Sequence, residues 1–257
     1  MGKILVINSN SNSETTRKLM EKLEPYSGRE TAITCVNPAR GPRVIDTLLD
    51  AAIGAIETVR LVAQNRHRYD AFVIACGLDP GLDACRSIVR APVIGIAEAG
   101  MLTACTLCRK FTVLTHTEVS VSAVNDLVHH YGLGSRLASV RPLAMTGAEM
   151  ADQERMVRKM EEASRRAVGD DGAELIVLPG VHWVGLEKGL SISVGVPVLS
   201  GAVCALRMAE FLIDYGLQTS QVGSYRPVSK QDPMIGYEDL KGVFQVEDDF
   251  SNSIDSP

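Results

Sequence analysis

The feature that most constrains the fold of this chain is an internal repeat of strand-like segments. Segments 3–8 (KILVIN) and 110–115 (KFTVLT) both run from a lysine through an apolar strand to a small polar residue, 107 residues apart. Segments 71–77 and 91–95 find similar partners 103 and 105 residues later. A period this long indicates a duplicated domain and not a solenoid. We therefore predict two similar lobes, residues 1–100 and 101–202.

The pattern within each lobe predicts the α/β class. Short apolar runs occur at 4–7, 72–75, 93–96, 111–114, 175–178 and 196–199, with amphipathic helical stretches such as 14–24 and 118–131 between most of them. Strands that alternate with helices indicate a mostly parallel sheet flanked by helices. We expect a helix at about 203–217 to complete the first lobe. Residues 218–257 form a C-terminal extension that packs on the body or on another subunit.

Two pseudo-symmetric lobes predict a site between them. Parallel sheets bind ligands beyond the carboxyl ends of their strands, and four such ends would converge if the lobes face one another. These ends are small, polar and rich in glycine, which suits donation of N–H and hydroxyl groups to a carboxylate or carbonyl oxygen. The predicted substrate-binding residues are Asn8, Asn10, Ser11, Gly77, Leu78, Asp79, Thr115, His116, Thr117, Gly180 and Val181.

Three segments carry a resemblance to the aspartate/glutamate/hydantoin racemase superfamily. Residues 7–11 (INSNS) resemble the opening of hydantoin racemases, and 75–84 (ACGLDPGLDA) resemble the segment with their first catalytic cysteine, here Cys76. The continuation at 93–99 is similar as well. The resemblance implies two lobes with the active site between them, and cysteine acid/base chemistry at a carbon next to a carbonyl or carboxylate.

The same resemblance implies an enzyme that needs no cofactor: no metal, pyridoxal phosphate or nicotinamide. The implied partners are a small carboxylate or cyclic amide substrate and further copies of the chain in a homo-oligomer.

Cys76 is the residue on which this chemistry depends. A thiol has a pKa of about 8.5, and a helix N-terminus with converging N–H groups can lower it enough to give a base near neutral pH. An arbitrary cysteine is more often a buried core residue. The Asp-Pro-Gly-Leu-Asp context after Cys76 favours the catalytic interpretation. Removal of an α-proton leaves an enolate, which preorganised donors must stabilise.

The second lobe departs from the family pattern. The resemblance places a second cysteine there in a Gly-Cys-Ala-Gly setting, but residues 178–183 read LPGVHW, and the repeat maps Cys76 to Gly180 or Pro179. Cys204 lies beyond the next strand and is a poor substitute. His182 is our candidate for the opposing acid or base, because a histidine titrates near neutral pH. His116 is a comparable candidate, and each could instead be a hydrogen-bonded loop histidine.

Three functions therefore remain open. The first is a racemase or isomerase acting through Cys76. The second is a one-cysteine lyase such as a decarboxylase, because arylmalonate decarboxylases of the same superfamily keep one cysteine, in the other lobe. The third is a small-molecule-binding protein without activity, against which an intact Cys76 argues.

Composition excludes several other classes. A net charge of −5 and a pI near 5.6 give no basic field for nucleic acid. No apolar run reaches the roughly 18 residues of a membrane span, and no export signal precedes the first strand. The six cysteines then indicate reduced thiols in the cytoplasm. The Cys105-Thr-Leu-Cys108 spacing lies in a predicted helix and lacks a second pair, so we expect core packing and no metal.

Overall fold

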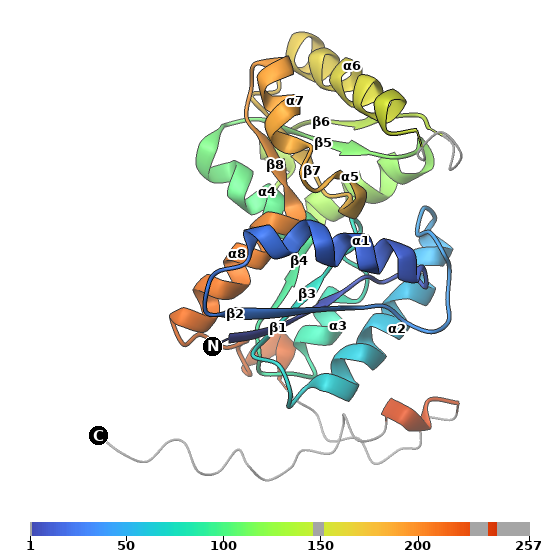
Figure 1. Cartoon of the computed structure of the whole chain (residues 1–257), viewed down its shortest axis with the longest axis vertical. Coiled ribbons are helices and arrows are strands. Elements are labelled where there is room, and N and C mark those ends of the chain that lie inside the picture. Colours follow the sequence, from blue (N-terminus) through green and yellow to red (C-terminus); the bar gives the residue numbers. More distant parts are fainter. Residues whose placement is uncertain (1, 146–151, 227–235, 241–257) are drawn as a thin grey trace.

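The computed structural model describes residues 2–145, 152–226 and 236–240, which form two stacked α/β lobes (Figure 1). Each lobe contains a parallel four-stranded sheet, in the order β2-β1-β3-β4 in the first and β6-β5-β7-β8 in the second. The strands are β1 Gly2–Ile7, β2 Thr31–Val36, β3 Ala71–Ile74, β4 Val93–Gly95, β5 Phe111–Thr115, β6 Leu137–Pro142, β7 Leu175–Leu178 and β8 Val198–Ser200. The identical strand order confirms the predicted two-lobe α/β fold.

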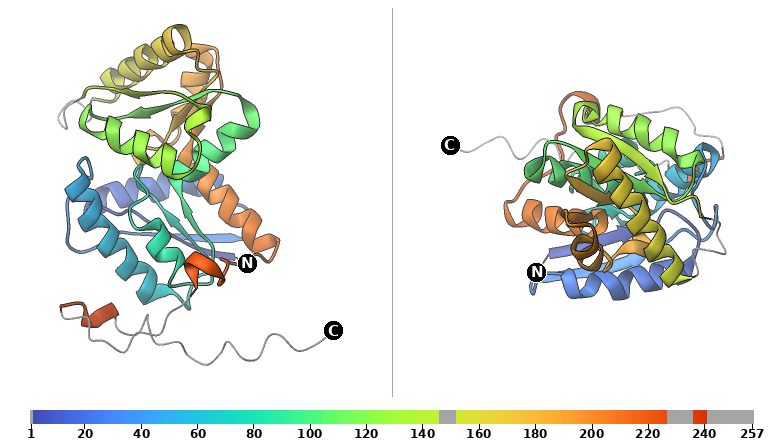
Figure 2. Two further views of the ribbon diagram at one scale, coloured as in Figure 1. Left: turned by 180° about the vertical axis from the view of Figure 1, so that it is seen from behind. Right: turned by 90° about the horizontal axis from the view of Figure 1, so that it is seen from above.

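Helices connect the strands and cover both faces of each sheet, as the side view from behind and the view from above show (Figure 2). The α-helices are α1 Ser13–Leu23, α2 Leu48–Asn65, α3 Leu82–Arg86, α4 Ile96–Leu107, α5 Val119–His130, α6 Gln153–Asp171, α7 Glu187–Val194 and α8 Gly201–Asp214. Short 3₁₀ helices are η1 Glu24–Tyr26, η2 Gly134–Arg136, η4 Val181–Trp183 and η5 Gly223–Tyr225. Within the described residues, no helix is long and apolar enough to cross a membrane.

Local sequence explains where several helices begin. The Asn12 side chain accepts a hydrogen bond from the Glu14 N–H at the start of α1. Thr47 and Asp50 form a reciprocal capping box on α2. These side chains satisfy N–H groups that have no partner within the helix, and so fix the points at which the loops end.

The apolar runs in the sequence did not predict two of the strands. β2 and β6 lie at sheet edges, each with one strand neighbour, and almost all of their residues are only partly buried. The central strands β1, β3, β5 and β7 and the short outer strands β4 and β8 are mostly buried and give the apolar runs that were predicted. A strand that is only partly buried needs no such run, so the sequences of β2 (TAITCV) and β6 (LASVRP) give a weak signal.

The two lobes exchange helices. α4 follows β4 of the first lobe but packs on the second sheet, where Met101 shares a core cluster with Phe111 and Val177. α8 follows β8 of the second lobe but packs on the first sheet, where Leu206 shares a cluster with Val73. Each sheet is therefore covered by a helix that begins in the other lobe.

α4 and α8 also cross each other closely, at two glycines. A Cβ atom on Gly201 would overlap the carbonyl oxygen of Ile96, and one on Gly100 would lie 3.1 Å from the Gly201 Cα. Glycine allows the two backbones to approach to a distance that any side chain would prevent. This crossing joins the lobes beside the ends of β4 and β8.

Of the predicted extension 218–257, only residues 218–226 and 236–240 are described. The Thr219 N–H donates to the Arg90 carbonyl oxygen at 2.8 Å, and the Arg60 guanidinium contacts Asp239 at 2.7 Å. Both contacts are with the first lobe. The remaining residues of the extension lie outside the described part of the chain.

The glycine crossing generates a stability prediction. Gly201→Ala should lower the free energy of unfolding by about 2 kcal/mol, because the added methyl group forces α4 and α8 apart. Gly169→Ala is the matched control: Gly169 is an exposed α6 residue whose Cβ would meet nothing within 4 Å. That variant should gain about 0.5–1 kcal/mol from helix propensity. Urea denaturation measures both, and equal effects would contradict the close crossing.

Candidate active site

A cavity lies between the lobes and is lined by the segments that follow β1, β3, β5 and β7, together with the loop before α2. Its lining residues are Asn8, Asn10, Val44, Ile45, Asp46, Ala75, Cys76, Gly77, Leu78, Leu114, Thr115, His116, Ser120, Val124, Pro179, Gly180, Val181, His182 and Trp183. The four strand ends that the sequence placed together therefore meet at one cavity.

Three predicted binding residues lie outside this lining and have local structural partners. The Ser11 hydroxyl donates to the Gly41 carbonyl oxygen at 2.9 Å. The Thr117 hydroxyl lies 3.1 Å from that of Ser120, near the start of α5. Asp79 accepts hydrogen bonds from N–H groups at the start of α4. The other predicted residues, Asn8, Asn10, Cys76, Gly77, Leu78, Thr115, His116, Gly180, Val181 and His182, all line the cavity.

Cys76 follows β3 in a tight turn. The Leu78 N–H donates to its Sγ, and the Asp79 N–H donates to its carbonyl oxygen at 2.9 Å. Burial raises the pKa of the thiol to about 12, and the charges of Asp79 and Asp46 add to this effect. We had expected a lowered pKa from a helix N-terminus, but α3 begins only at Leu82 and the burial outweighs the single N–H bond. The resting group is a thiol.

The strand register identifies the matching position in the second lobe. Ala71 of β3 pairs with Ile4 of β1, and Leu175 of β7 pairs with Phe111 of β5, so the repeat aligns these strands residue by residue. Cys76 then corresponds to Gly180. A Cβ atom on that glycine would lie 2.7 Å from the ring of Trp183 and 3.1 Å from His116 Cε1. Two aromatic rings occupy the space that a second thiol would need.

These two rings stack on each other. The centroids of His116 and Trp183 are 4.2 Å apart at an interplanar angle of 32°. Within the described residues, His116 Nε2 and Trp183 Nε1 are buried without a hydrogen-bond partner. Burial also lowers the pKa of His116 to about 4, so its imidazole is neutral at pH 7.

His182 has a different environment. Its carbonyl oxygen accepts a hydrogen bond from Lys22 Nζ at 2.7 Å. Desolvation lowers the pKa of its imidazole, and the positive charges of Lys22 and Lys18 lower it further. The ring centroids of His182 and His116 are 6.4 Å apart. Both histidines therefore reach the cavity, but His116 is the one in contact with the Gly180 position.

Sequence reasoning missed the loop before α2. Val44, Ile45 and Asp46 line the cavity, although the sequence analysis made no prediction for their segment. Burial raises the pKa of the Asp46 carboxyl, and the nearby Asp50 adds to the shift. The Thr-x-x-Asp capping box at 47–50 was the available signal for the start of this helix. Also missed were Ala75, Leu114, Ser120, Val124, Pro179 and Trp183.

The ionisable groups on the lining are few. Among the residues that the structure describes, Asp46 is the single carboxylate of the lining, Cys76, His116 and His182 are its other titratable residues, and it contains no lysine or arginine. Within the described ranges, no three His, Cys, Asp or Glu residues gather as a metal site would require. The cavity thus offers one thiol, two imidazoles and one carboxylate.

Comparison with known proteins decides the family. The model of the Asp/Glu/Hydantoin racemase family matches residues 4–209. The chain belongs to this family. The resemblance predicted from Cys76 and its neighbours is confirmed.

Individual relatives agree with this assignment. The chain is 36% identical to the hydantoin racemase of Paenarthrobacter aurescens over 233 residues, which cover 89% of this chain and 99% of that protein. The allantoin racemase from Klebsiella pneumoniae is 29% identical with a TM-score of 0.88, covering 93% of this chain and 99% of that one. A glutamate racemase from Bacillus anthracis shares the fold, with a TM-score of 0.60 at 17% identity. That match covers 85% of this chain and 84% of the other. These relatives support a racemase and give the lyase alternative no support.

The environment of His116 predicts a pH dependence of stability. Its folded pKa of about 4 lies below the ordinary value of 6.5, so between these values the unfolded chain binds a proton that the folded protein does not. Stability should therefore fall as the pH drops through this range, by up to about 3 kcal/mol. Urea denaturation at pH 7 and 4.5 should show a larger loss for the wild type than for His116→Gln. Equal losses would exclude His116 as the titrating group.

Proposed function

We propose that this protein is a racemase that inverts a carbon next to a carbonyl group in a small cyclic amide of the hydantoin or allantoin kind. The observation that carries the proposal is the cavity between the lobes, in which the Cys76 thiol and the His116 imidazole are both on the lining and His116 adjoins the position matching Cys76. The named activities of the hydantoin and allantoin racemases support the choice of substrate. Cys76 and His116 act as the acid/base pair.

The protonation states of this pair suit racemisation. With the pKa of Cys76 raised and that of His116 lowered, the resting enzyme holds a thiol and a neutral imidazole. The imidazole first accepts the α-proton from one face of the substrate, which leaves an enolate, and the thiol then gives its proton to the other face. The products of these two steps are an imidazolium and a thiolate, which stabilise each other and catalyse the reverse direction. Proton exchange with solvent restores the neutral pair.

The enolate oxygen formed between these steps needs donors. Asn10 Oδ1 accepts hydrogen bonds from the Asn12 N–H at 2.9 Å and from Asn8 Nδ2 at 3.0 Å, which turns the amide Nδ2 of Asn10 toward other partners. Asn10 and the backbone N–H groups of Gly77 and Val181 are the donors that we assign to the carbonyl oxygen. Each of these residues is on the cavity lining.

Asp46 favours a cyclic amide over a carboxylate substrate. Its carboxylate is close enough to Cys76 to raise the pKa of the thiol, and the described part of the lining has no lysine or arginine to offset a substrate carboxylate. Two carboxylates in one partly buried cavity repel each other. A ring N–H of a cyclic amide, in contrast, can donate a charge-assisted hydrogen bond to Asp46.

Removal of the thiol gives the principal test. Cys76→Ala should lower kcat for racemisation of 5-substituted hydantoins or allantoin at least about 10³-fold, because the cysteine provides one of two proton transfers. Polarimetry measures the rate, and NMR in D₂O measures exchange of the α-hydrogen. Wild-type activity in the variant would exclude the thiol mechanism. Release of CO₂ from a malonate with deuterium incorporated into the product would indicate a lyase instead.

Parallel variants identify the second acid/base. His116→Gln should lose about 10²-fold or more in kcat, whereas His182→Gln should retain most of it, since general acid/base groups contribute that much. The opposite pattern would assign the role to His182, as the sequence first indicated.

Ligand-induced thermal stabilisation without turnover across cyclic amides and carboxylates would favour a binding protein. Location in the cytoplasm and assembly into a homo-oligomer stay predictions.

A charge-neutral variant tests the substrate class. Asp46→Asn should raise KM for a hydantoin about tenfold with a smaller effect on kcat, because the charged acceptor for a ring N–H is lost. A hydantoin methylated on the contacted ring nitrogen serves as the control, and its KM should be similar for wild type and variant. If the variant instead left KM for the unmethylated hydantoin unchanged, Asp46 would have no part in recognition.

A further inference from the structure

The turn after Cys76 is fixed by Asp79, whose backbone and side chain are both unusual. Asp79 has a φ of 43°, a left-handed conformation that few non-glycine residues adopt. Its carboxylate accepts hydrogen bonds from the N–H groups of Ala97 at 3.0 Å and Glu98 at 2.8 Å, in the first turn of α4. The residue is 4% exposed. A buried carboxylate and a strained backbone three residues from the thiol indicate a position that the fold maintains.

Gly95 provides the space for this carboxylate. A Cβ atom on Gly95 would overlap the Asp79 side chain. Burial raises the pKa of this carboxyl to about 7, whereas the N–H groups of Glu98 and Ala97 favour its charged form, which also interacts favourably with the helix dipole. The Cys76 turn is therefore attached to α4, the helix that the first lobe contributes to the second.

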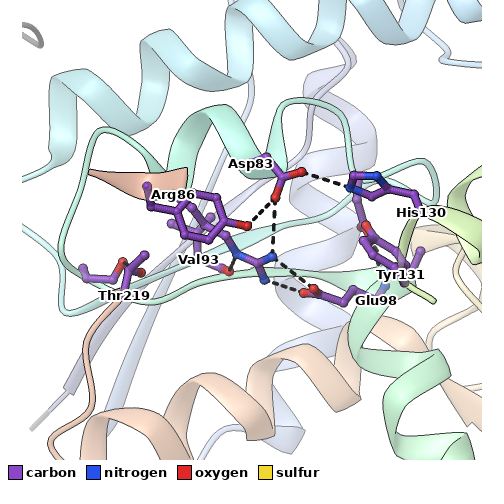
Figure 3. A network of polar contacts seen from close by, with 11 residues as sticks. Asp83, Arg86, Val93, Glu98, His130, Tyr131 and Thr219 are labelled. Carbon is purple, nitrogen blue, oxygen red and sulfur yellow. Dashed lines mark hydrogen bonds and ion pairs between the residues drawn. The ribbon is translucent and has the colours of Figure 1, made fainter. Parts of the chain in front are cut away.

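A third hydrogen bond to Asp79 comes from the second lobe. The hydroxyl of Tyr131, directly after α5, donates to Asp79 Oδ2 at 2.8 Å. The preceding residue, His130, contacts the Asp83 carboxylate through Nε2 at 3.0 Å. Figure 3 shows His130 and Tyr131 side by side, facing the segment that includes Asp83. Two consecutive residues of one lobe thus hold the cysteine-bearing segment of the other.

The contacts around Arg86 make that segment a single unit. The Arg86 guanidinium bonds to the carboxylate of Glu98 and to the carbonyl oxygen of Val93 (Figure 3). These bonds connect α3, β4 and α4. The Cys76 turn and its flanking helix therefore move together with α4 and not as an independent loop.

α5 connects this contact to the opposite side of the cavity. Val124 of α5 lines the cavity, and the helix follows the loop that carries His116. Tyr131 lies at the other end of the same helix. A hydrogen-bonded helix is stiff over this length, so its two ends keep a fixed separation.

We infer that Asp79 and Tyr131 form a positioning pair that sets the location of the Cys76 thiol relative to His116. Asp79 holds the turn on α4, and Tyr131 ties that turn to the helix following the His116 loop. Neither residue lines the cavity, so neither contacts the substrate. The inference deepens the proposed racemase and rests on it for its catalytic consequence, whereas its effect on the Cys76 turn does not require that activity.

The test is Tyr131→Phe, with Tyr26→Phe as its matched control. The first variant removes the hydroxyl that reaches Asp79 and keeps the ring. The Tyr26 hydroxyl also crosses between lobes, donating to the Glu187 carboxylate at 2.7 Å, but it joins η1 to α7 and makes no bond to the Cys76 turn. Tyr26→Phe therefore loosens the lobes by one similar hydrogen bond and leaves the Cys76 turn intact.

Two readouts distinguish positioning from general stability. Tyr131→Phe should lower kcat about tenfold with KM within about twofold, because a misplaced thiol impairs proton transfer while the cavity lining is unchanged. The alkylation rate of Cys76 by iodoacetamide, followed by peptide mass spectrometry across pH, should rise about threefold as the turn opens more often. Tyr26→Phe should leave both measurements near wild type.

The outcomes separate this inference from the proposed function. Unchanged Cys76 alkylation in Tyr131→Phe would overturn the positioning pair, as would equal changes in both variants. Faster alkylation of Cys76 in Tyr131→Phe but not in Tyr26→Phe supports the pair, whether or not the wild type turns over a cyclic amide. Absence of that turnover in the wild type would defeat the proposed racemase and leave the positioning pair supported. Altered alkylation together with the fall in kcat supports both.

Discussion

The backbone contact between α4 and α8 at Gly100 and Gly201 is the constraint on which the rest of the structure depends. Each helix begins at a strand of one lobe and covers the sheet of the other, so separating the lobes would expose two hydrophobic cores at once. The cavity between them is consequently a fixed feature of the fold. Because Asp79 caps α4, the Cys76 turn is connected directly to this crossing.

The duplicated fold makes the asymmetry of the site informative. Equivalent positions after β3 and β7 hold Cys76 and Gly180, and three residues later hold Asp79 and Trp183. In the first lobe that later residue is a carboxylate that fixes a thiol. In the second it is an indole that fills the space beside a glycine and stacks on His116. In the second lobe, aromatic packing thus brings an imidazole to the place that corresponds to the thiol of the first lobe.

Sequence alone predicted the parts of this molecule that depend on buried, periodic strands. Apolar runs and the repeat predicted the four central strands, the short outer strands β4 and β8, and the convergence of the carboxyl ends of the central strands. The partly buried strands β2 and β6 were not predicted, since such a strand needs no apolar run. Asp46, in the loop after β2, was missed with them. The role of Asp79 and the direction of the Cys76 pKa shift depend on burial and on partners such as Tyr131 that are distant in sequence. No local pattern contains that information.

Burial of Cys76 and His116 on opposite sides of the cavity sets their protonation states. Desolvation disfavours the charged form of each group separately, which keeps the Cys76 thiol and the His116 imidazole neutral in the resting enzyme. In the proposed mechanism, proton transfer through a substrate creates two opposite charges together, and their mutual attraction in a low-dielectric site offsets much of that desolvation cost. The proposed thiol and imidazole would then exchange roles with the direction of the reaction, provided that the lobes hold them at a constant separation.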